Sequence, residues 1–405
     1  MKQEWSVYIY KALSPDWKED LNKINVDHYA LKKLSQKLSH YVFYIKDVSS
    51  IAANIIKQEA LSKGGEAVVS RQILTNLDTK TDILLSLTGR QLDAFCLNLK
   101  EQPFRLKQLA NELRSCHRNY NSNLPKINIS DKILDFNNNV YVMGILNVTP
   151  DSFYDGGKFN TEENALKHAK EMILAGADII DVGGESTRPG SKSVSAEEEL
   201  GRVIPLIRKI RKVYPEILVS IDTTKSIVAE KAISAGANII NDISAGLFDK
   251  EMFRIVEQYR VPYVLMHTLD RPDKMQTNIN YNDLLADIYS GLKDRIQAAC
   301  NAGIDEKLLI IDPGFGFGKT VNHNLVLLNN LSIFKSLGLP ILVGTSNKSF
   351  IKKSIEQSVN GCAMGTAATV SISVLNGANI IRVHDVKKMQ EIVKMSYNVC
   401  RSQSK

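Results

Sequence analysis

The sequence lacks the cysteine and leader patterns that identify several common classes of protein. Its five cysteines lie far apart, and no C-x-x-C pair occurs. Neither a zinc site nor a disulfide framework is therefore indicated, and this cysteine usage suits a reducing cytosol. The first residues, MKQEWSVYIYK, contain no apolar core long enough for a secretion signal. We therefore expect a cytoplasmic protein.

Long runs of like charge are also missing. The net charge is +7, and the positive excess lies in residues 1–130, where no run of Lys or Arg exceeds two residues. Scattered charge of this kind is typical of a solvated face, so we expect no nucleic-acid partner. The uncharged run 357–381 is long enough to cross a bilayer, but it contains many Asn, Ser, Thr and Gly residues. A buried helix followed by a buried strand explains it better, and we expect no membrane association.

A nucleotide-phosphate loop is absent as well, although the segment IDPGFGFGKT at 311–320 looks similar to one. The motif G-x-x-x-x-G-K-[ST] requires a glycine five positions before its last glycine, and Pro313 stands there. Proline has no backbone N–H and cannot take a positive φ. The segment therefore has another function, and that function must account for the presence of Asp312, Phe317 and Lys319 together.

What the sequence does contain is an alternation of short apolar runs with helical stretches from residue 140 onwards. Eight such runs begin at residues 141, 177, 217, 237, 261, 308, 341 and 378, and each ends in polar residues or glycine. Strands of this kind are covered on both faces, and eight of them predict an α/β TIM (β/α)8 barrel rather than an open doubly wound sheet. The repeated strings AGADIIDVGG, AGANIINDIS and NGANIIRVHD support this, because each places a helix-ending glycine directly before a strand.

The chain is predicted to have two domains. We expect the barrel over residues 136–402, and a small α+β domain of unknown role over residues 1–120 with strands at 41–48, 66–73 and 82–89. Residues 121–135 are polar and turn-forming, which predicts a linker. The following string ILDFNNNVYVMG is compatible with a hairpin that closes the barrel floor.

Polar side chains gather where the eight apolar runs end, which is where a TIM barrel has its active site. They are Asn147, Thr149, Asp151, Glu185, Ser186, Thr187, Arg188, Asp222, Asn241, Asp242, Met266, His267, Asp312, Ser346, Asn347, Lys348, Ser349, Arg382, His384 and Asp385. Carboxylates and amides match the N–H edges of a polar heterocycle, whereas Arg and His suit a phosphate. A single such residue can equally cap a loop, but the joint pattern favours a binding site.

Some residues near these strand ends are expected to have structural rather than binding roles. We expect His267 to be a core histidine, Phe315 to lie in the core, and Glu185 to bind backbone amides of its own loop. Lys319 and Thr320 are expected to begin a helix or to face solvent, and Phe317 is open to a core or a substrate role.

Seven strings in order carry a family resemblance: MGILNVTPDSFYDGG, GGESTRPGS, SIDT, NDIS, LMHT, IDPGFGFGK and RVHDV. Over residues 138–400 the chain resembles the dihydropteroate synthase family, and residues 1–125 resemble an N-terminal extension found on some members. The resemblance implies condensation of 6-hydroxymethyl-7,8-dihydropterin pyrophosphate with para-aminobenzoate, release of pyrophosphate, Mg2+ as cofactor and a homodimer. For the extension we expect a structural or assembly role.

The resemblance also implies roles for matching residues. The pterin would be held by Asp222, Asn241, Met266, Asp312 and Lys348. Pyrophosphate would be bound by Asn147, Arg188, Arg382 and His384, with Asn147 also a Mg2+ ligand. The para-aminobenzoate pocket would be formed by Phe153, Thr187, Pro189, Phe317 and Ser349. Catalysis would fall to Asp222, Lys348, Arg382, His384 and Asn147, while loops 149–160 and 185–194 close over the substrates.

One position departs from the family pattern, and two other functions stay open. Where the family commonly has S-R-K-S, this chain has Asn347 between Ser346 and Lys348. We therefore expect a less positive arylcarboxylate pocket and a raised KM for para-aminobenzoate. The alternatives are a corrinoid-linked pterin methyltransferase, which needs no pyrophosphate pocket, and a pterin-binding protein without turnover.

Overall fold

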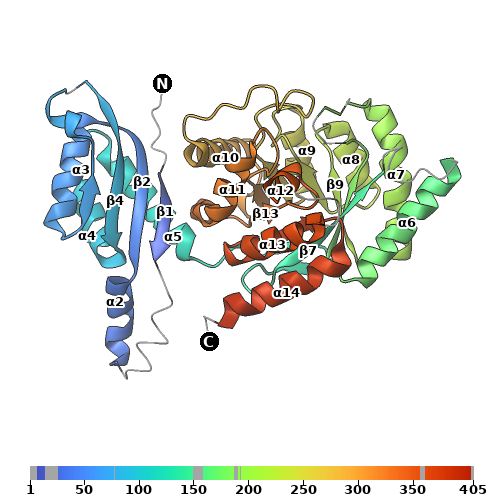
Figure 1. The fold of residues 1–405 in the computed structure, drawn as a ribbon, viewed down its shortest axis with the longest axis horizontal. Coiled ribbons are helices and arrows are strands. Elements are labelled where there is room, and N and C mark those ends of the chain that lie inside the picture. Colours follow the sequence, from blue (N-terminus) through green and yellow to red (C-terminus); the bar gives the residue numbers. More distant parts are fainter. Residues whose placement is uncertain are drawn as a thin grey trace. The chain divides into compact units, whose positions relative to one another are not determined.

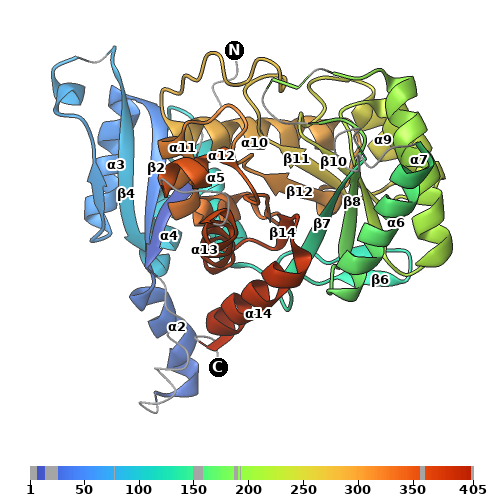
Figure 2. The ribbon, with the colours of Figure 1, turned by 45° about the vertical axis from the view of Figure 1, so that its right-hand side comes forward.

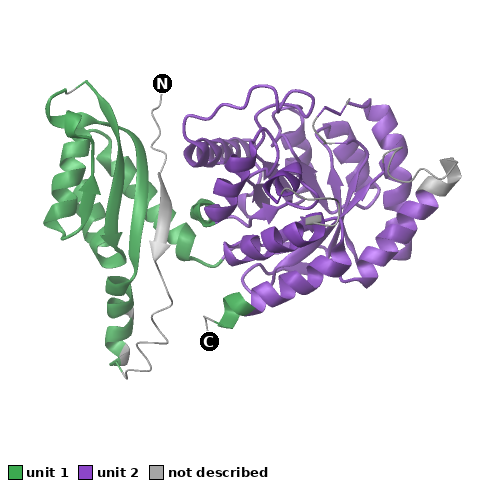
Figure 3. Cartoon of the chain, viewed as in Figure 1, with its two compact units in different colours: residues 1–123, 332–338, 399–405 green, residues 124–331, 339–398 purple. Residues whose placement is uncertain are grey.

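The computed structural model describes residues 7–13, 26–76, 78–148, 158–186, 190–191, 193–355 and 361–402. The chain divides into two compact units (Figure 3). Unit 1 comprises residues 1–123, 332–338 and 399–405, and unit 2 comprises residues 124–331 and 339–398.

Unit 1 contains a four-stranded antiparallel sheet in the order β1-β2-β4-β3. Its strands are β1 (Val7–Leu13), β2 (His40–Ser49), β3 (Glu66–Val68) and β4 (Lys80–Thr88), and its helices are α2 (His28–Leu38), α3 (Ser50–Ser62), η1 (Arg71–Leu74), α4 (Gly89–Leu99) and α5 (Leu106–Asn121). Burial alternates along β2 and β4, as expected for strands with one covered face. The buried residues of α3, α4 and α5, such as Ile56, Phe95 and Leu109, complete this core.

Unit 2 is a closed barrel of eight parallel strands surrounded by helices (Figure 1, Figure 2). The strands are β7 (Tyr141–Asn147), β8 (Ile179–Gly183), β9 (Leu218–Asp222), β10 (Ile239–Asp242), β11 (Tyr263–Met266), β12 (Leu309–Asp312), β13 (Leu342–Val343) and β14 (Ile380–Val383). Closure is completed by a parallel bridge between Ile311 and Ile341 and by the bond from the Ile311 N–H to the Pro340 carbonyl, 2.9 Å long. The predicted TIM barrel is thereby confirmed.

The helices that follow the strands begin with α6 and end with α14. They are α6 (Lys158–Leu174), α7 (Ala196–Val213), α8 (Ser226–Ser234), α9 (Met252–Tyr259), α10 (Leu284–Asn301), η3 (Glu306–Leu308), α11 (Val321–Asn329), η4 (Leu331–Leu337), α12 (Ser349–Ser354), α13 (Gly361–Leu375) and α14 (Val386–Ser402). The uncharged run contains helix α13 followed by strand β14, the order that its sequence predicted, but α13 is only partly buried, because Met364 and Leu375 are exposed. Among the described residues, no helix is both long and apolar enough to cross a membrane.

A hairpin covers the barrel floor, and it lies inside the segment 121–135 for which the sequence predicts a linker. Strand β5 (Ile127–Ile129) pairs antiparallel with β6 (Lys132–Leu134). The hairpin side chains Ile127, Ile129 and Leu134, followed by Phe136, form one buried cluster with the first residues of the barrel strands, such as Ile179 and Ile239. The linker expectation is corrected here, because alternating apolar residues among the polar ones give this segment a covered face.

Candidate active site

An ion-paired centre lies inside the barrel near the carboxyl ends of the strands. The Arg382 side chain, from β14, donates from Nε to Asp181 and from Nη2 to Asp222, and both distances are 2.6 Å. Asn241, at the end of β10, donates from Nδ2 to the same Asp181 oxygen at 3.0 Å. A guanidinium has five N–H donors, so Arg382 keeps donors for an anion while it is held by two carboxylates.

Asp222 is buried, and this raises the pKa of its carboxyl to about 7. The Arg382 guanidinium acts in the opposite direction, while the negative charges of Asp181 and Glu199 raise the pKa further. A carboxylate with these neighbours keeps its charge only through its cationic partner. Asp222 is therefore poised to respond to a bound cation or to a ring that donates hydrogen bonds.

The segment 312–320 forms the next part of the mouth, and its geometry confirms that it is not a phosphate loop. The N–H groups of Gly314 and Gly316 donate to Asp312 Oδ1 and Asn324 Oδ1, each at 2.7 Å, so they are satisfied within the protein. Gly314 has φ 73°, and a Cβ there would lie 2.0 Å from the His267 carbonyl oxygen, so only glycine fits. Burial raises the pKa of Asp312 to about 6.

Lys319 lies inside the protein, which corrects the expectation that it faces solvent or begins a helix. It is 4% exposed, and its Nζ lies 3.1 Å from the Phe317 carbonyl oxygen and 3.2 Å from His267 Nδ1. Burial lowers the pKa of Lys319 to about 7, and burial together with Lys319 lowers the pKa of His267. Thr320 does cap a helix, because its hydroxyl accepts from the His323 N–H at the start of α11.

An apolar wall stands beside these charges. Ile243, Met266, Met275 and Phe317 are buried and form one cluster. The Lys348 Nζ lies 4.2 Å from the centroid of the Phe317 ring, a cation–π distance. Burial, reinforced by Arg382, lowers the pKa of Lys348 to about 8. A flat aromatic molecule could therefore contact both an apolar surface and a cation here.

The third side of the mouth carries groups suited to an anion. His384 donates its backbone N–H to Ser346 Oγ at 3.2 Å, and its Nδ1 lies 3.0 Å from the same oxygen. Asn147, the last residue of β7, is half-buried. A Cβ built at Gly183 of β8 would lie 3.2 Å from Asn147 Oδ1 and 3.8 Å from Asp222 Oδ2, so glycine leaves room for both side chains.

The remaining predicted positions are partly outside this cluster. Ser349 is exposed at the start of α12, while Phe315 is buried and stacks on Phe350, as the core interpretation expected. Glu185 pairs with Lys225, whereas most of the loop whose backbone amides it was expected to bind lies outside the described residues, so that expectation stays a prediction. The predicted residues Phe153, Thr187, Arg188 and Pro189 lie outside the described residues.

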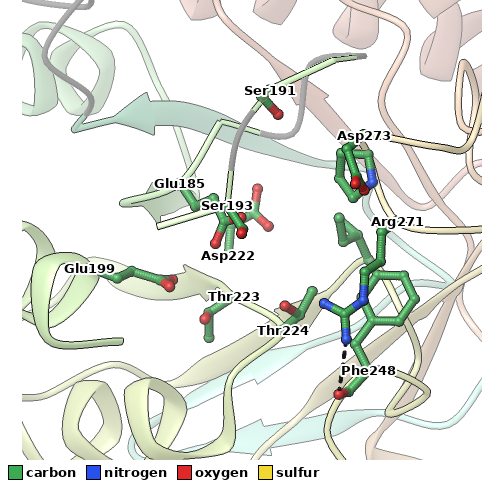
Figure 4. A pocket seen from close by; sticks show the side chains of 12 residues that line it. Glu185, Ser191, Ser193, Glu199, Asp222, Thr223, Thr224, Phe248, Arg271 and Asp273 are labelled. Carbon is green, nitrogen blue, oxygen red and sulfur yellow. Dashed lines mark hydrogen bonds between the residues drawn. The ribbon is translucent and has the colours of Figure 1, made fainter. Parts of the chain in front are cut away.

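A cavity of about 90 Å³ opens beside Asp222 (Figure 4). The residues that line it are Glu185, Ser191, Ser193, Glu199, Asp222, Thr223, Thr224, Ile243, Phe248, Arg271, Pro272 and Asp273. Sequence reasoning missed Asp181, Glu199, Lys225 and Arg271. A lone acidic residue inside an otherwise apolar strand was the available signal for Asp181, whereas nothing in the local pattern distinguished the other three.

Comparisons with known proteins agree with this geometry. A family model described as a pterin binding enzyme matches residues 143–384. The dihydropteroate synthase of Bacillus subtilis is 48% identical over 269 residues, which cover 66% of this chain and 92% of that protein. The Yersinia pestis dihydropteroate synthase, solved as a sulfonamide drug complex, has a TM-score of 0.64 and 40% identity, and the match covers 68% of this chain and 99% of that one.

A further solved structure, the Xanthomonas albilineans dihydropteroate synthase with 4-aminobenzoic acid, has a TM-score of 0.63 and 40% identity over 68% of this chain and 98% of that one. The family match covers more than half of the chain, and the B. subtilis relative is covered almost completely. The chain therefore belongs to the dihydropteroate synthase family of pterin binding enzymes.

Proposed function

We propose that the barrel mouth joins 6-hydroxymethyl-7,8-dihydropterin pyrophosphate to para-aminobenzoate with the residues named above in the roles set out below. As a dihydropteroate synthase the chain is a transferase. One observation supports the residue roles: Arg382 is paired with Asp222 at 2.6 Å, and the charges of Arg382 and Lys348 both lower the pKa values of Asp222 and Asp312 within one mouth. The alternative methyltransferase would not need the cations on the anion side.

The pterin is recognised by hydrogen bonds at its edge and by packing on its face. Asp222, Asn241 and Asp312 supply carboxylate and amide groups for the ring N–H and carbonyl positions. Met266 and the apolar wall around it contact the ring face. Because these polar groups are buried, a ring that lacked the matching N–H groups would leave them unpaired, and this gives the site its selectivity.

Mg2+ is compatible with the groups present at the end of β7. This ion prefers oxygen ligands, keeps several waters and usually binds through one or two protein groups plus substrate phosphates. The half-buried amide oxygen of Asn147 beside Asp222 suits that need. Among the described residues, no group of three or more His, Cys, Asp or Glu could hold a metal ion by itself, which agrees with a site completed by substrate. When bound, Mg2+ would neutralise charge on pyrophosphate oxygens.

The reaction proceeds as a dissociative substitution. The C–O bond between the exocyclic methylene and pyrophosphate breaks, and its electron pair leaves with pyrophosphate towards Arg382 and His384. The methylene cation is conjugated with the pterin, and the negative charge of Asp222 stabilises it. The arylamine nitrogen then forms the C–N bond and releases a proton to solvent.

The arylamine approaches from the side of Phe317 and Lys348. The Phe317 ring supplies an apolar contact, and the ammonium group of Lys348 over that ring supplies a cation for the arylcarboxylate or the pterin. Ser349 follows directly in α12 and offers a hydroxyl at the exposed rim. Thr187, Pro189, Phe153 and Arg188 keep their predicted roles in the two loops that exclude water.

A homodimer is supported by exposed apolar side chains on α13 and α14. Met364 is 78% exposed, Leu375 is 51% exposed and Met395 is 65% exposed. The two helices lie together, since Ser396 Oγ and Ser371 Oγ are 2.9 Å apart. We expect Met364→Glu with Met395→Glu to convert a dimer into a monomer, measured as the mass in solution by light scattering. For unit 1 we keep the predicted structural or assembly role. The cytosolic location of the whole chain stays a prediction.

The reaction is tested by incubating the purified chain with the pterin pyrophosphate, para-aminobenzoate and Mg2+. We expect one pyrophosphate released per dihydropteroate formed, and no dihydropteroate when either substrate is omitted. Binding of the pterin without product would instead support a pterin-binding protein, and absence of both would overturn the proposal.

A further inference from the structure

Ser346 lies in the loop after β13, where its hydroxyl oxygen contacts His384 twice. The His384 backbone N–H donates to Ser346 Oγ at 3.2 Å, and Nδ1 of the His384 ring lies 3.0 Å from the same oxygen. Ser346 is 5% exposed, and no third partner of its hydroxyl occurs among the residues that the structure describes. Both contacts of this buried hydroxyl are therefore made with one residue.

These two contacts determine which ring nitrogen of His384 carries the proton. A hydroxyl has one donor and two acceptor positions, and the backbone N–H occupies one acceptor position. A buried O–H that donates to nothing costs free energy, and Nδ1 is the acceptor within reach. The Ser346 hydroxyl thus donates to Nδ1. In a neutral imidazole one nitrogen donates and the other accepts, so Nε2 carries the proton.

The loop that carries Ser346 is anchored without help from His384. Thr369 Oγ1 of α13 lies 2.9 Å from Thr345 Oγ1, and the Lys348 N–H donates to the Thr345 carbonyl at 3.2 Å. Thr345 is 1% exposed, so this anchor lies inside the protein. The Ser346 hydroxyl is therefore presented by a fixed loop, and the position of Lys348 does not depend on it.

Arg382, the other donor on the anion side of the mouth, is oriented by different groups. Its guanidinium donates to Asp181 and to Asp222, each at 2.6 Å. His384 follows directly after the end of β14 and is oriented by a hydroxyl instead of by carboxylates. Loss of that hydroxyl should therefore disturb His384 and leave Arg382 in place.

We propose that Ser346 is a positioning residue that holds the His384 imidazole in the tautomer with its proton on Nε2, so that this N–H donates to the leaving pyrophosphate. The inference rests on the proposed function, because it assigns one atom of His384 to the pyrophosphate contact. Ser346 itself touches neither substrate. A ring with its proton on Nδ1 would present a lone pair at Nε2 to the anion, and the two would repel each other.

Two substitutions of His384 separate the roles of its ring nitrogens. Glutamine can place its amide N–H near the position of Nε2, whereas the shorter asparagine reaches only the position of Nδ1. We expect His384→Asn to lower kcat/KM for the pterin pyrophosphate about 100-fold, as for loss of one donor to a developing anion, and His384→Gln to be about tenfold more active than His384→Asn. Equal activities, or a more active His384→Asn, would overturn the inference.

Ser346→Ala removes the hydroxyl, and Ser373→Ala is its matched control. Ser373 is also buried, but its hydroxyl donates to the Thr369 carbonyl within α13 at 2.7 Å. We expect Ser346→Ala to lower kcat/KM for the pterin pyrophosphate about tenfold, while the Kd for 6-hydroxymethyl-7,8-dihydropterin, which lacks pyrophosphate, stays within about twofold. Ser373→Ala should change neither constant. An equal loss of affinity for the pyrophosphate-free pterin would show that Ser346 only supports the fold of the mouth.

The double variant Ser346→Ala/His384→Gln tests whether the serine acts through the imidazole. We expect it to be no less active than His384→Gln alone, because the imidazole through which Ser346 acts is already gone. A further tenfold loss in the double variant would show that Ser346 acts on the substrate by itself, and this would overturn the inference.

The position of the proton is read directly by nitrogen NMR of the whole chain labelled with 15N-histidine. The resonances of His384 are identified by their absence from the His384→Gln spectrum, at pH 9, where a histidine with the ordinary pKa of about 6.5 is neutral. We expect a protonated Nε2 and an unprotonated Nδ1 in the wild type, and a mixture of both tautomers in Ser346→Ala. A proton on Nδ1 in the wild type would contradict the proposal.

The test does not depend on the folding of one variant. If Ser346→Ala does not fold, the wild-type spectrum and the two His384 variants decide the question. Absence of pyrophosphate release by the wild-type chain would contradict the proposed function instead, and the wild-type spectrum would still report the tautomer.

Discussion

The floor and the mouth of the barrel are built on the same eight strands but with opposite chemistry. At the floor, the first strand residues pack with Phe136 and the hairpin β5–β6 into a buried apolar cluster. At the mouth, the last strand residues place Asp222, Asp312 and the paired Arg382 in surroundings that shift their pKa values. Burial of apolar area stabilises the first, whereas burial of charge costs free energy at the second. The barrel thus separates stability from chemistry along its axis.

The largest expected effect is at the floor. Phe136 is buried against Tyr141, with ring centroids 5.5 Å apart. Phe136→Ala should lower the free energy of unfolding by about 3–5 kcal/mol, because it removes a large side chain and leaves a cavity. Denaturant unfolding measures this, and kcat/KM per folded molecule should remain within about twofold of wild type.

Ile133 is the matched control for this variant. It lies on the hairpin β5–β6 that directly precedes Phe136 but is 58% exposed, so Ile133→Ala should lower the free energy of unfolding by less than about 0.5 kcal/mol. Equal losses of stability in the two variants would show that the hairpin is not the cover of the core.

The next effect is at the mouth, where Asp312→Asn should lower kcat/KM about 100-fold, as expected for loss of a buried hydrogen bond to a charged group. The melting temperature at pH 8 should not fall. The pKa of Asp312 in the folded protein is about 6, above the ordinary aspartate value of 3.8, so its contribution to stability is present in acid and is lost as the pH rises through about 6. The side-chain amide of the Asp312→Asn variant does not ionise, so this variant does not lose that stability as the pH rises.

Asp385→Asn serves as the control for the mouth. Asp385 also follows a barrel strand, but its side chain is 45% exposed and pairs with Lys388. The turnover of the Asp385→Asn variant should equal that of the wild type. A drop in melting temperature for Asp312→Asn with unchanged turnover would reverse the assignment of chemistry to the mouth.

A smaller effect is expected from pH alone. If an ionised Asp312 accepts hydrogen bonds from the pterin ring, affinity should fall about tenfold between pH 7.5 and pH 5, because the pKa lies near 6. Calorimetric titration of the pterin substrate over this range measures it. The dependence should be weaker in Asp312→Asn, and identical profiles for the two proteins would exclude this carboxylate from the pterin contact.

The smallest effect concerns Asn347, which is exposed and has φ 57°. Asn347→Arg should lower the KM for para-aminobenzoate about threefold by adding a cation beside Lys348, although arginine is less tolerant of this backbone conformation than asparagine. Steady-state kinetics with varied arylamine tests this. An unchanged KM would remove the idea that Asn347 makes the arylcarboxylate pocket less positive.

Much of the barrel could be predicted because its signals are local. Each strand run is apolar and ends in glycine or polar residues, so the sequence alone predicts that Asp222, Asn241 and Asp312 lie at the ends of β9, β10 and β12, as they do. The carboxyl ends of parallel strands meet on one side of a barrel, and this geometric rule brings such residues together without further information.

The features that the sequence did not reveal depend on the direction of side chains and on partners that are distant along the chain. Lys319 points inward because the chain turns through Gly316 and Gly318 at positive φ, and these angles are not encoded by composition. Lys225, Glu199 and Glu185 are separated along the chain and meet only through the packing of α7 against the barrel loops. A hairpin over the floor was expected at 133–144, but it lies at 127–134, where the apolar residues alternate with Asn, Ser and Lys.

A crystal structure with the pterin substrate tests the central claim most directly. The ring should lie on the wall of Met266 and Phe317, with its N–H groups within hydrogen-bond distance of Asp312 and Asp222 and with the pyrophosphate towards His384. A ring bound elsewhere on the chain, or one in the mouth whose edge does not meet those carboxylates, would contradict the account.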